Sequence, residues 1–304
     1  MSTFSIVIPC LNAIATLGET LDSLLTQTDR DWEALVVDDG STDGSWALAA
    51  TYAAQDPRIR PMRNPGRGPS AARNLVIAEG RGDIIAFCDA DDLWAPEKLT
   101  RMRRAFADTR ADAVFARIAF FDGRGTRTVS TVPGGDLTVP MLMGENPVCT
   151  MSNLAIRREV FVASGGLDTT MVHNEDLEYL IRLAATGYRI RGLDETLVYY
   201  RTSPTGLSSN LDAMRRGRSA ALATAARHGF APDARAEAIH LRYLARRALR
   251  TDAPAHEALR LAFGGAMTSP SGFFSDLKRG GLTLACAAAA PLMPRRLRRA
   301  LFSH

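Results

Sequence analysis

Three carboxylates stand within four residues, at Asp89, Asp91 and Asp92, directly after the apolar run of residues 83–88. Carboxylates this close repel one another in a partly desolvated site unless a cation or a positive ligand compensates their charge. Oxygen ligands favour Mg²⁺ or Mn²⁺ over Zn²⁺, and Mg²⁺ commonly binds one or two carboxylates together with substrate phosphates. The cluster indicates either a divalent-metal site for a nucleoside diphosphate or a solvated turn before Pro96.

A second acidic stretch, Asp38 and Asp39 with residues 40–43 (Gly-Ser-Thr-Asp), follows the apolar run of residues 32–37. One carboxylate here can accept a hydrogen bond from the N–H of a pyrimidine ring, and another can accept one from a ribose hydroxyl. The same residues are also typical of a plain turn followed by a helix cap. On its own, this stretch leaves both interpretations open.

The elements that must position these residues follow from the pattern of apolar side chains. Short β-branched runs predict strands at residues 4–8, 32–37, 59–63, 83–88, 113–121 and 188–200. Helical spacing predicts helices between several of them, including residues 45–54 and 175–186. This alternation predicts an α/β fold with right-handed βαβ units and a mostly parallel sheet flanked by helices. Ligands bind at the carboxyl ends of such strands, so both acidic stretches are expected on one rim.

Composition argues against several classes of protein. The four cysteines are widely separated and show no metal-ligand spacing, so neither disulfides nor zinc is expected and a reducing, cytoplasmic setting fits best. The N-terminus shows no basic segment followed by a long apolar one, so no secretory signal is expected. The longest apolar run, residues 282–293, is shorter than the roughly 20 residues that a membrane-spanning helix needs.

Charge divides the chain into two parts. Residues 1–210 hold 21 basic and 27 acidic side chains, whereas residues 211–304 hold 16 basic and 6 acidic ones. The second part is rich in Ala, Arg and Leu and is interrupted by prolines at 232, 254, 270 and 291. We therefore expect a catalytic α/β domain at residues 1–210 and a basic, helical C-terminal appendage at residues 211–304.

Taken together, four spaced blocks resemble the family 2 glycosyltransferases of the GT-A fold. They are residues 5–9 (Ser-Ile-Val-Ile-Pro) with Asn12, residues 37–43, residues 71–74 (Ala-Ala-Arg-Asn), and residues 89–92 with Trp94. With residues 165–168 and 175–176, the resemblance covers about residues 4–205. It implies a mixed, mostly parallel GT-A-like sheet. It also implies inverting transfer of a sugar from a nucleotide diphosphate sugar, most commonly a UDP-sugar, to a hydroxyl of an acceptor glycan or lipid-linked sugar in cell-envelope polysaccharide biosynthesis.

The resemblance also implies roles for individual residues. Those expected to contact the nucleotide are Pro9, Asn12, Asp38, Asp39, Arg73 and Asp89. Asp91 is expected to bind the Mn²⁺ or Mg²⁺ that bridges the diphosphate, and Arg73 to approach the diphosphate itself. Asp176 is expected to be the general base that deprotonates the acceptor hydroxyl. Without the upstream blocks, Glu175 and Asp176 would be typical of acidic residues in the first turn of a helix.

Three residues beside these motifs could also contact the substrates, but for each of them another interpretation remains open. His173 either touches the acceptor or is polar surface, and Trp94 either forms an apolar platform for a sugar ring or packs in the core. Many family members carry a histidine after the late strand. Here Tyr199-Tyr200-Arg201 is followed by Thr-Ser-Pro-Thr-Gly, which contains no histidine. Either Arg201 neutralises the phosphates instead, or the metal is bound only by Asp91, donor oxygens and water.

Other functions remain as alternatives. Residues 66–71 (Gly-Arg-Gly-Pro-Ser-Ala), with Asp89 about twenty residues later, satisfy the dinucleotide fingerprint of an NAD(P)-dependent oxidoreductase, although that fingerprint normally follows the first strand. A sugar-1-phosphate nucleotidyltransferase would carry a glycine-rich, basic phosphate loop after the first strand, which residues 9–13 do not form. A catalytically degenerate glycan-binding protein on the same fold is a third alternative.

The C-terminal part has its own expected partner. Residues 294–302 place Leu297 and Leu301 on one helical face flanked by arginines, and residues 282–293 could insert shallowly into a bilayer. This pattern indicates either peripheral contact with an anionic membrane on its cytoplasmic side or a solvated basic helix. No nucleic-acid partner is expected, because no aromatic residues are interleaved with the arginines.

Overall fold

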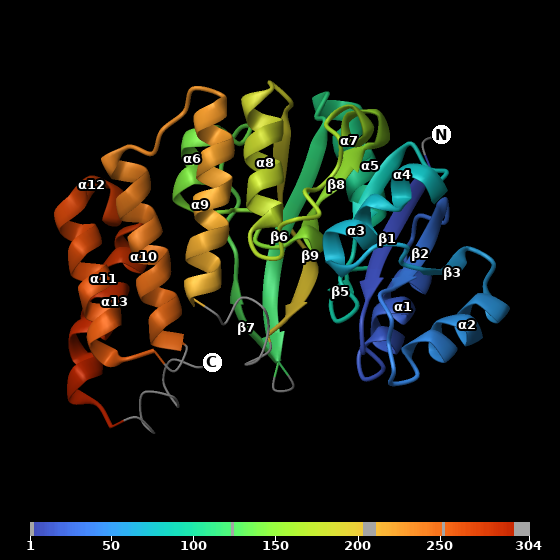
Figure 1. Cartoon of the computed structure of the whole chain (residues 1–304), viewed down its shortest axis with the longest axis horizontal. Coiled ribbons are helices and arrows are strands. Elements are labelled where there is room, and N and C mark those ends of the chain that lie inside the picture. Colours follow the sequence, from blue (N-terminus) through green and yellow to red (C-terminus); the bar gives the residue numbers. More distant parts are fainter. Residues whose placement is uncertain (1–2, 123–124, 203–210, 251–252, 295–304) are drawn as a thin grey trace. The chain divides into compact units, whose positions relative to one another are not determined.

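The computed structural model describes residues 3–122, 125–202, 211–250 and 253–294 (Figure 1). The chain divides into two compact units: Met1–Leu137 with Pro147–Thr202, and Thr138–Asn146 with Ser203–His304. The sequence analysis placed residues 138–146 in the N-terminal domain. In the structure this short segment packs against the C-terminal helices instead.

One sheet forms the centre of the first unit, and nine strands of the described residues take part in it. Four strands in the order β3-β2-β1-β4 are parallel: β1 Phe4–Cys10, β2 Trp32–Asp38, β3 Ile59–Arg63 and β4 Ile84–Phe87. The sheet continues with β8 Ala155–Arg157, β6 Ala113–Asp122, β9 Ile190–Arg201 and β5 Leu93–Trp94, and β7 Gly125–Val129 pairs with β6. β8 is antiparallel to both neighbours, whereas β6 and β9 are parallel. The mixed, mostly parallel sheet expected from the sequence is confirmed.

Side chains that alternate along the strands pack against helices on both faces of the sheet. On one face, Ile6 and Ile8 of β1 share a buried cluster with Leu21 of α1 (Leu17–Leu25), and α2 (Ser45–Gln55) and α5 (Lys98–Thr109) complete it. On the other face, the Phe87 ring lies 5.5 Å from that of Phe161. The helices that pack from that side are α3 Gly68–Asn74, α4 Val76–Glu79, α7 Arg158–Ala163 and α8 Glu175–Ala185. A 3-10 turn, η1 (Met151–Asn153), precedes β8.

Asn74, the last residue of α3, fixes this helix to a loop more than ninety residues later. Its side chain exchanges two hydrogen bonds of 2.8 Å with the backbone N–H and C=O of Leu167. Gly166 has φ +70°, and a Cβ there would lie 2.6 Å from Asn74 Oδ1, so only glycine fits. The contact therefore joins two of the sequence blocks and positions α3 against the loop that leads to α8.

The boundaries of α3 and α8 have local causes. Pro69 lies in the first turn of α3, where its fixed φ suits a helix and its missing N–H costs nothing. α8 begins after Asn174, whose φ of 58° is left-handed, and its first turn carries Glu175, Asp176 and Glu178, where the helix dipole favours acidic groups. The helix ends just before Gly187, which has φ +90°. These two helices carry Arg73 and Asp176 respectively.

The second unit is helical. Its elements are α6 Val139–Gly144, α9 Leu211–Arg227, α10 Ala234–Arg250, α11 Ala255–Thr268, α12 Pro270–Phe273, α13 Leu277–Ala289 and the 3-10 turn η3 Ala290–Leu292. The prolines at 232, 254, 270 and 291 fall between helices or at their starts, as predicted. Ala245, Leu261 and Phe273 contribute to its core. None of the helices in the described part of the chain has both the length and the hydropathy needed to cross a bilayer.

Candidate functional site

The loops after the parallel strands meet on one rim, as the sequence analysis expected. At the strand ends, Cys10 of β1 pairs with Asp38 of β2, and the backbone N–H of Cys88 donates to Val7 O at 3.0 Å. The hydroxyl of Thr16 then donates to Ala90 O at 2.9 Å. The loop after β1 therefore contacts the acidic stretch after β4 directly.

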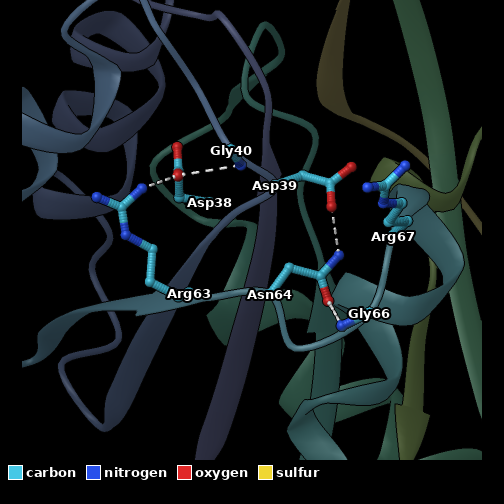
Figure 2. Close-up of a pocket in the computed structure, with 7 residues that line it drawn as sticks. All are labelled: Asp38, Asp39, Gly40, Arg63, Asn64, Gly66 and Arg67. Carbon is cyan, nitrogen blue, oxygen red and sulfur yellow. Dashed lines mark hydrogen bonds and ion pairs between the residues drawn. The ribbon is translucent and has the colours of Figure 1, made fainter.

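An open pocket of about 440 Å³ lies on this rim (Figure 2). Its walls come from the turns after β2 and β3, and the lining residues are Asp38, Asp39, Gly40, Arg63, Asn64, Gly66 and Arg67. Asp39 is half-buried and accepts hydrogen bonds from Asn64 Nδ2 at 2.6 Å and from the backbone N–H of Gly68 at 2.9 Å. These bonds join the turn after β2 to the glycine-rich turn that starts α3.

Asp38 is 2% exposed, and its carboxylate supports the turn from within. It accepts hydrogen bonds from the backbone N–H groups of Gly40 and Ser41 and forms an ion pair with Arg63. The Arg63 guanidinium lies over the ring of Trp46, 3.8 Å from its centroid. The geometry thus gives Asp38 a positioning role and leaves Asp39 as the carboxylate that is more accessible from the pocket.

Asn12 connects the first and second strand ends. Its side-chain Oδ1 accepts a hydrogen bond from the backbone N–H of Thr42 at 2.9 Å, and its own backbone N–H donates to Ser41 Oγ at 2.9 Å. Its φ of 50° is unusual for a residue other than glycine, and such backbone strain is often found at functional sites. Pro9 precedes it on β1, in register with Val37, so both predicted residues lie at the rim.

Asp89 is held by groups from two separate segments, α3 and residues 150–152. Its carboxylate accepts a hydrogen bond from Arg73 at 2.7 Å and one from Thr150 Oγ1 at 3.0 Å. Its backbone N–H donates to Ser152 Oγ at 3.0 Å. Thr150 and Ser152 were not anticipated, because isolated hydroxyl residues some sixty positions away give no signal in the sequence.

Asp91 and Asp92 lie beside the end of β9. Arg201 donates from its backbone N–H to Asp92 Oδ1 at 3.0 Å and from Nε to the backbone oxygen of Asp91 at 2.9 Å. Burial, followed by the charge of Asp89, raises the pKa of Asp91 to about 6. The second carboxylate oxygen of Asp92 is buried without a hydrogen-bond partner among the described residues. This arrangement concentrates negative charge that a cation would relieve.

The donor set fits a hard divalent cation that takes few protein ligands. Within the described residues, no group of three His, Cys, Asp or Glu side chains is arranged to hold a metal by itself. Mg²⁺ and related ions commonly bind one or two carboxylates and complete their coordination with phosphate oxygens and water. Asp91, with Asp89 beside it, supplies oxygen ligands of this kind. The residues present therefore fit Mn²⁺ or Mg²⁺ bound together with a diphosphate.

Arg73 joins the acidic stretch after β4 to the acidic pair on α8. It is 5% exposed and donates to Asp89 at 2.7 Å and to Glu175 at 3.1 Å. Next to Glu175, burial and then the Glu175 charge raise the pKa of Asp176 to about 7, while Arg73 acts in the opposite direction. The structure thus brings Asp89, Arg73, Glu175 and Asp176 together, although they come from three distant parts of the sequence.

The remaining predicted residues have different environments. Trp94 is 3% exposed, its indole N–H donates to Ser152 O at 3.3 Å, and the Lys98 ammonium lies 3.7 Å from its ring centroid. Its ring is therefore enclosed in the core, which supports packing rather than a sugar platform. His173 is half-buried in the loop before α8. Lys98 was not anticipated, and burial lowers its pKa to about 7.

Comparison with protein families gives one match that covers more than half of the chain. The model described as "Glycosyl transferase family 2" matches residues 5–164 of the 304. These residues include β1 to β4, the pocket and the acidic stretch after β4. The glycine-rich turn at residues 66–71 follows β3 rather than the first strand, so the dinucleotide fingerprint stands in the wrong place and the oxidoreductase alternative is rejected.

Curated relatives agree with this match. The chain is 30% identical to the uncharacterized glycosyltransferase EpsJ of Bacillus subtilis, over 67% of this chain and 62% of that protein. It is 32% identical to the succinoglycan biosynthesis protein ExoA of Rhizobium meliloti, over 64% of this chain and 62% of that protein. The alignments thus span less than two thirds of these relatives' own lengths.

Solved structures resemble the chain at lower identity. TarS of S. aureus, residues 1–349 in complex with UDP, has a TM-score of 0.60 and 18% identity, and covers 99% of this chain and 89% of that one. The mannosyltransferase PcManGT of Pyrobaculum calidifontis, in complex with GDP-Man and Mn²⁺, has a TM-score of 0.55 and 19% identity, with 99% and 84% covered. At this identity the likeness shows the fold, and the GT-A-like architecture is confirmed.

Proposed function

The chain belongs to glycosyl transferase family 2, and on this premise we propose that it transfers a sugar from a nucleotide diphosphate sugar to an acceptor hydroxyl with inversion at the anomeric carbon. The observation that carries the proposal is the pair of hydrogen bonds made by Arg73. They connect Asp89, beside the proposed donor phosphates, to Glu175, beside the proposed base. Donor and acceptor chemistry would therefore share one hydrogen-bonded unit.

Asp176 is the group that we propose as the general base. A base works best when its pKa lies near the working pH, and the pKa of Asp176 is raised to about 7. The Asp176 carboxylate takes the proton from the acceptor hydroxyl as that oxygen attacks the anomeric carbon. The bond from this carbon to the diphosphate oxygen breaks on the opposite side, and the electron pair leaves with the nucleoside diphosphate. One displacement of this kind inverts the configuration.

The opposite side of the site holds the leaving group. Asp91, with Asp89, would hold Mn²⁺ or Mg²⁺, and the bound ion would neutralise charge that develops on the diphosphate. Asp39, accessible from the pocket, would accept a hydrogen bond from the nucleoside. Arg201 holds the segment of Asp91 and Asp92 against the end of β9.

The donor and acceptor classes are proposed by analogy with the relatives. One solved neighbour holds UDP-GlcNAc and another holds GDP-Man, so the fold accommodates different bases, and we propose a UDP-sugar. Two curated relatives are named for succinoglycan and for teichuronic acid biosynthesis. An acceptor glycan or lipid-linked sugar of a cell-envelope polysaccharide, reached from the cytoplasm, is the corresponding proposal.

The proposed reaction is tested by product formation. The purified chain is incubated with Mn²⁺ and a panel of UDP-, GDP- and dTDP-sugars, with envelope glycans as acceptors, and the released nucleoside diphosphate is measured. We expect one donor to give release that increases with acceptor. If every donor remains intact while the protein retains affinity for glycans, the degenerate glycan-binding alternative replaces the transferase.

Asp39→Asn tests the pocket separately. The two Asp39 oxygens accept separately, Oδ1 from Asn64 Nδ2 and Oδ2 from the Gly68 N–H, and the substitution preserves size but replaces one of these oxygens with an NH₂ group. A hydrogen bond to a charged group contributes about 1.5–3 kcal/mol, so we expect nucleoside diphosphate affinity to fall about tenfold or more. Isothermal titration calorimetry measures the change. Asp108→Asn on the exposed side of α5 is the matched control, and equal affinity in both variants would contradict a nucleoside contact at Asp39.

A further inference from the structure

Large apolar side chains are exposed on the outer helices of the second unit. Five of them, between 56% and 87% exposed, come from α11, α13 and η3: Phe263, Met267, Leu277, Leu282 and Leu292. Single exposed apolar residues are ordinary on protein surfaces, but a contiguous group usually marks an interaction site. The question is therefore whether these five share one surface.

Helical spacing places two of these five side chains together, and packing brings α11 and α13 side by side. Phe263 and Met267 are four residues apart, which puts them on one face of α11. The exposed positions of α13 include Leu277, Leu282 and the small residues between and after them, and residues 280–294 contain no Asp, Glu, Lys or Arg. α11 and α13 pack against each other (Figure 1). Buried residues of both helices belong to the same core cluster as Phe273. The outward face of α13 is uncharged from residue 280 onward, whereas that of α11 also carries Arg260, whose side chain is 65% exposed and pairs with Glu257.

Basic groups accompany this surface. Lys278 is exposed in the first turn of α13, and Arg279 follows it. Arg246 and Arg250 of α10 lie within electrostatic reach of Arg279, and neither has a carboxylate within salt-bridge distance among the described residues. Burial, together with the charges of Arg279 and Arg242, lowers the pKa of Arg246 against the opposing effect of Glu145. Arg279 pairs with Asp276 at 3.3 Å, so the net positive charge of the cluster comes from Arg246, Arg250 and Lys278.

The combination of apolar and basic groups indicates which kind of partner binds this surface. A second copy of the chain, meeting this face across a two-fold axis, would bring like charges together at a cost in binding. The surface of an anionic bilayer accepts both features, because apolar side chains enter the boundary between headgroups and acyl chains while arginines and lysines bind lipid phosphates. α13 is about 20 Å long at 1.5 Å per residue, too short to span a core of about 30 Å. It would therefore lie in the plane of the interface.

We propose that the outer faces of α11 and α13, with the basic groups beside them, form a surface that docks on an anionic lipid bilayer. This lipid-facing surface goes beyond the proposed transfer reaction and does not depend on it. The sequence analysis placed membrane contact in residues 282–302. Of these, residues 295–302 lie outside the described residues, and the structure adds Phe263, Met267 and Leu277 from elsewhere in the chain. Docking here would hold the enzyme at the surface where lipid-linked acceptors are found.

Vesicle flotation with the full chain tests the proposal. One vesicle preparation contains phosphatidylcholine alone, and the other contains one third phosphatidylglycerol. We expect at least tenfold stronger binding to the anionic vesicles, weakening at high salt because salt screens the phosphates. In the variant Phe263→Glu with Leu282→Glu, which places two negative charges on the lipid-facing surface, we expect anionic vesicle binding to fall at least tenfold.

A control variant in the first unit and a melting measurement separate loss of vesicle binding from loss of folding. Val129→Glu with Val162→Glu introduces the same charges at exposed apolar positions of the first unit and is expected to bind vesicles like the unmodified protein. Circular dichroism melting of both variants verifies that they are folded. Equal binding to neutral and anionic vesicles, or unchanged binding by the Phe263/Leu282 variant, overturns the proposal. So does a dimer in solution that this variant dissociates, because a second copy would then cover the surface. Flotation does not depend on sugar transfer, so failure here leaves the proposed reaction standing.

Discussion

Asp176→Asn is expected to lower kcat about a thousandfold while leaving nucleoside diphosphate affinity nearly unchanged. General base catalysis contributes roughly 10²–10⁴-fold, and an amide cannot take the proton from the acceptor hydroxyl. Nucleotide binding should persist because the pocket lies at the ends of β2 and β3 and no residue of α8 lines it. Steady-state kinetics with saturating donor and acceptor measure the loss. Glu159→Gln on the exposed side of α7 is the control, and a loss of less than tenfold at Asp176 would contradict its role as base.

The raised pKa of Asp176 predicts how both kcat and folding stability change with pH. Because the carboxylate must be unprotonated and its pKa is raised to about 7, kcat should rise with pH through about 7 and then level off. The contribution of Asp176 to folding stability falls over the same pH range in which kcat rises. A folded-state pKa above the ordinary 3.8 adds stability at low pH that is lost as pH rises through about 7. Asp176→Asn should therefore raise the melting temperature at pH 8. A pH-rate profile without this limb would contradict the assignment.

Arg73→Met is expected to lower the free energy of unfolding by about 3–5 kcal/mol. The substitution retains most of the buried volume but leaves Asp89 and Glu175 without their positive partner. Removing one member of a buried ion pair costs about this much, because the remaining charge is desolvated and uncompensated. The pKa of Asp176 should also rise further, because Arg73 now lowers it. Urea denaturation followed by fluorescence, together with the pH-rate profile, measures both effects.

Two companion variants identify the cause of any loss at Arg73. Arg73→Lys keeps the charge but lacks the planar guanidinium that contacts two carboxylates at once. Its free energy of unfolding should therefore lie between those of the unmodified protein and Arg73→Met. Arg104→Met on the exposed side of α5 should cost little. If Arg73→Met destabilises the chain no more than Arg104→Met does, the bridge contributes little to the fold.

Most of the fold was predictable because the parallel strands are buried on both faces and give continuous apolar runs. The strands at residues 4–8 and 32–37 were found with one or two extra residues at their ends. The short strands β5 and β8 were missed, since two or three residues show no periodicity. The assignment of residues 138–146 to the second unit is a tertiary contact that no local pattern indicates.

The site could be predicted only in part. Motif residues at strand ends were correctly expected on one rim, because parallel strands direct their carboxyl ends to the same edge. What the sequence did not indicate is how the carboxylates are used. Asp38 is saturated by Arg63 and two backbone N–H groups, and Arg73 contacts the α8 pair as well as Asp89. These differences depend on side-chain directions that spacing along the chain does not contain.

A thermal-shift titration of the unmodified chain and of Asp91→Ala tests whether the site binds a nucleoside diphosphate together with a metal. UDP, GDP, dTDP, NAD and NADP are each added with and without Mn²⁺. Ligands that bind only the folded state raise its melting temperature with concentration. We expect a Mn²⁺-dependent rise with one nucleoside diphosphate, most strongly with UDP, that disappears in Asp91→Ala. No rise with any nucleoside diphosphate, or a rise with NAD or NADP alone, would contradict the assignment as a nucleotide-sugar-dependent transferase.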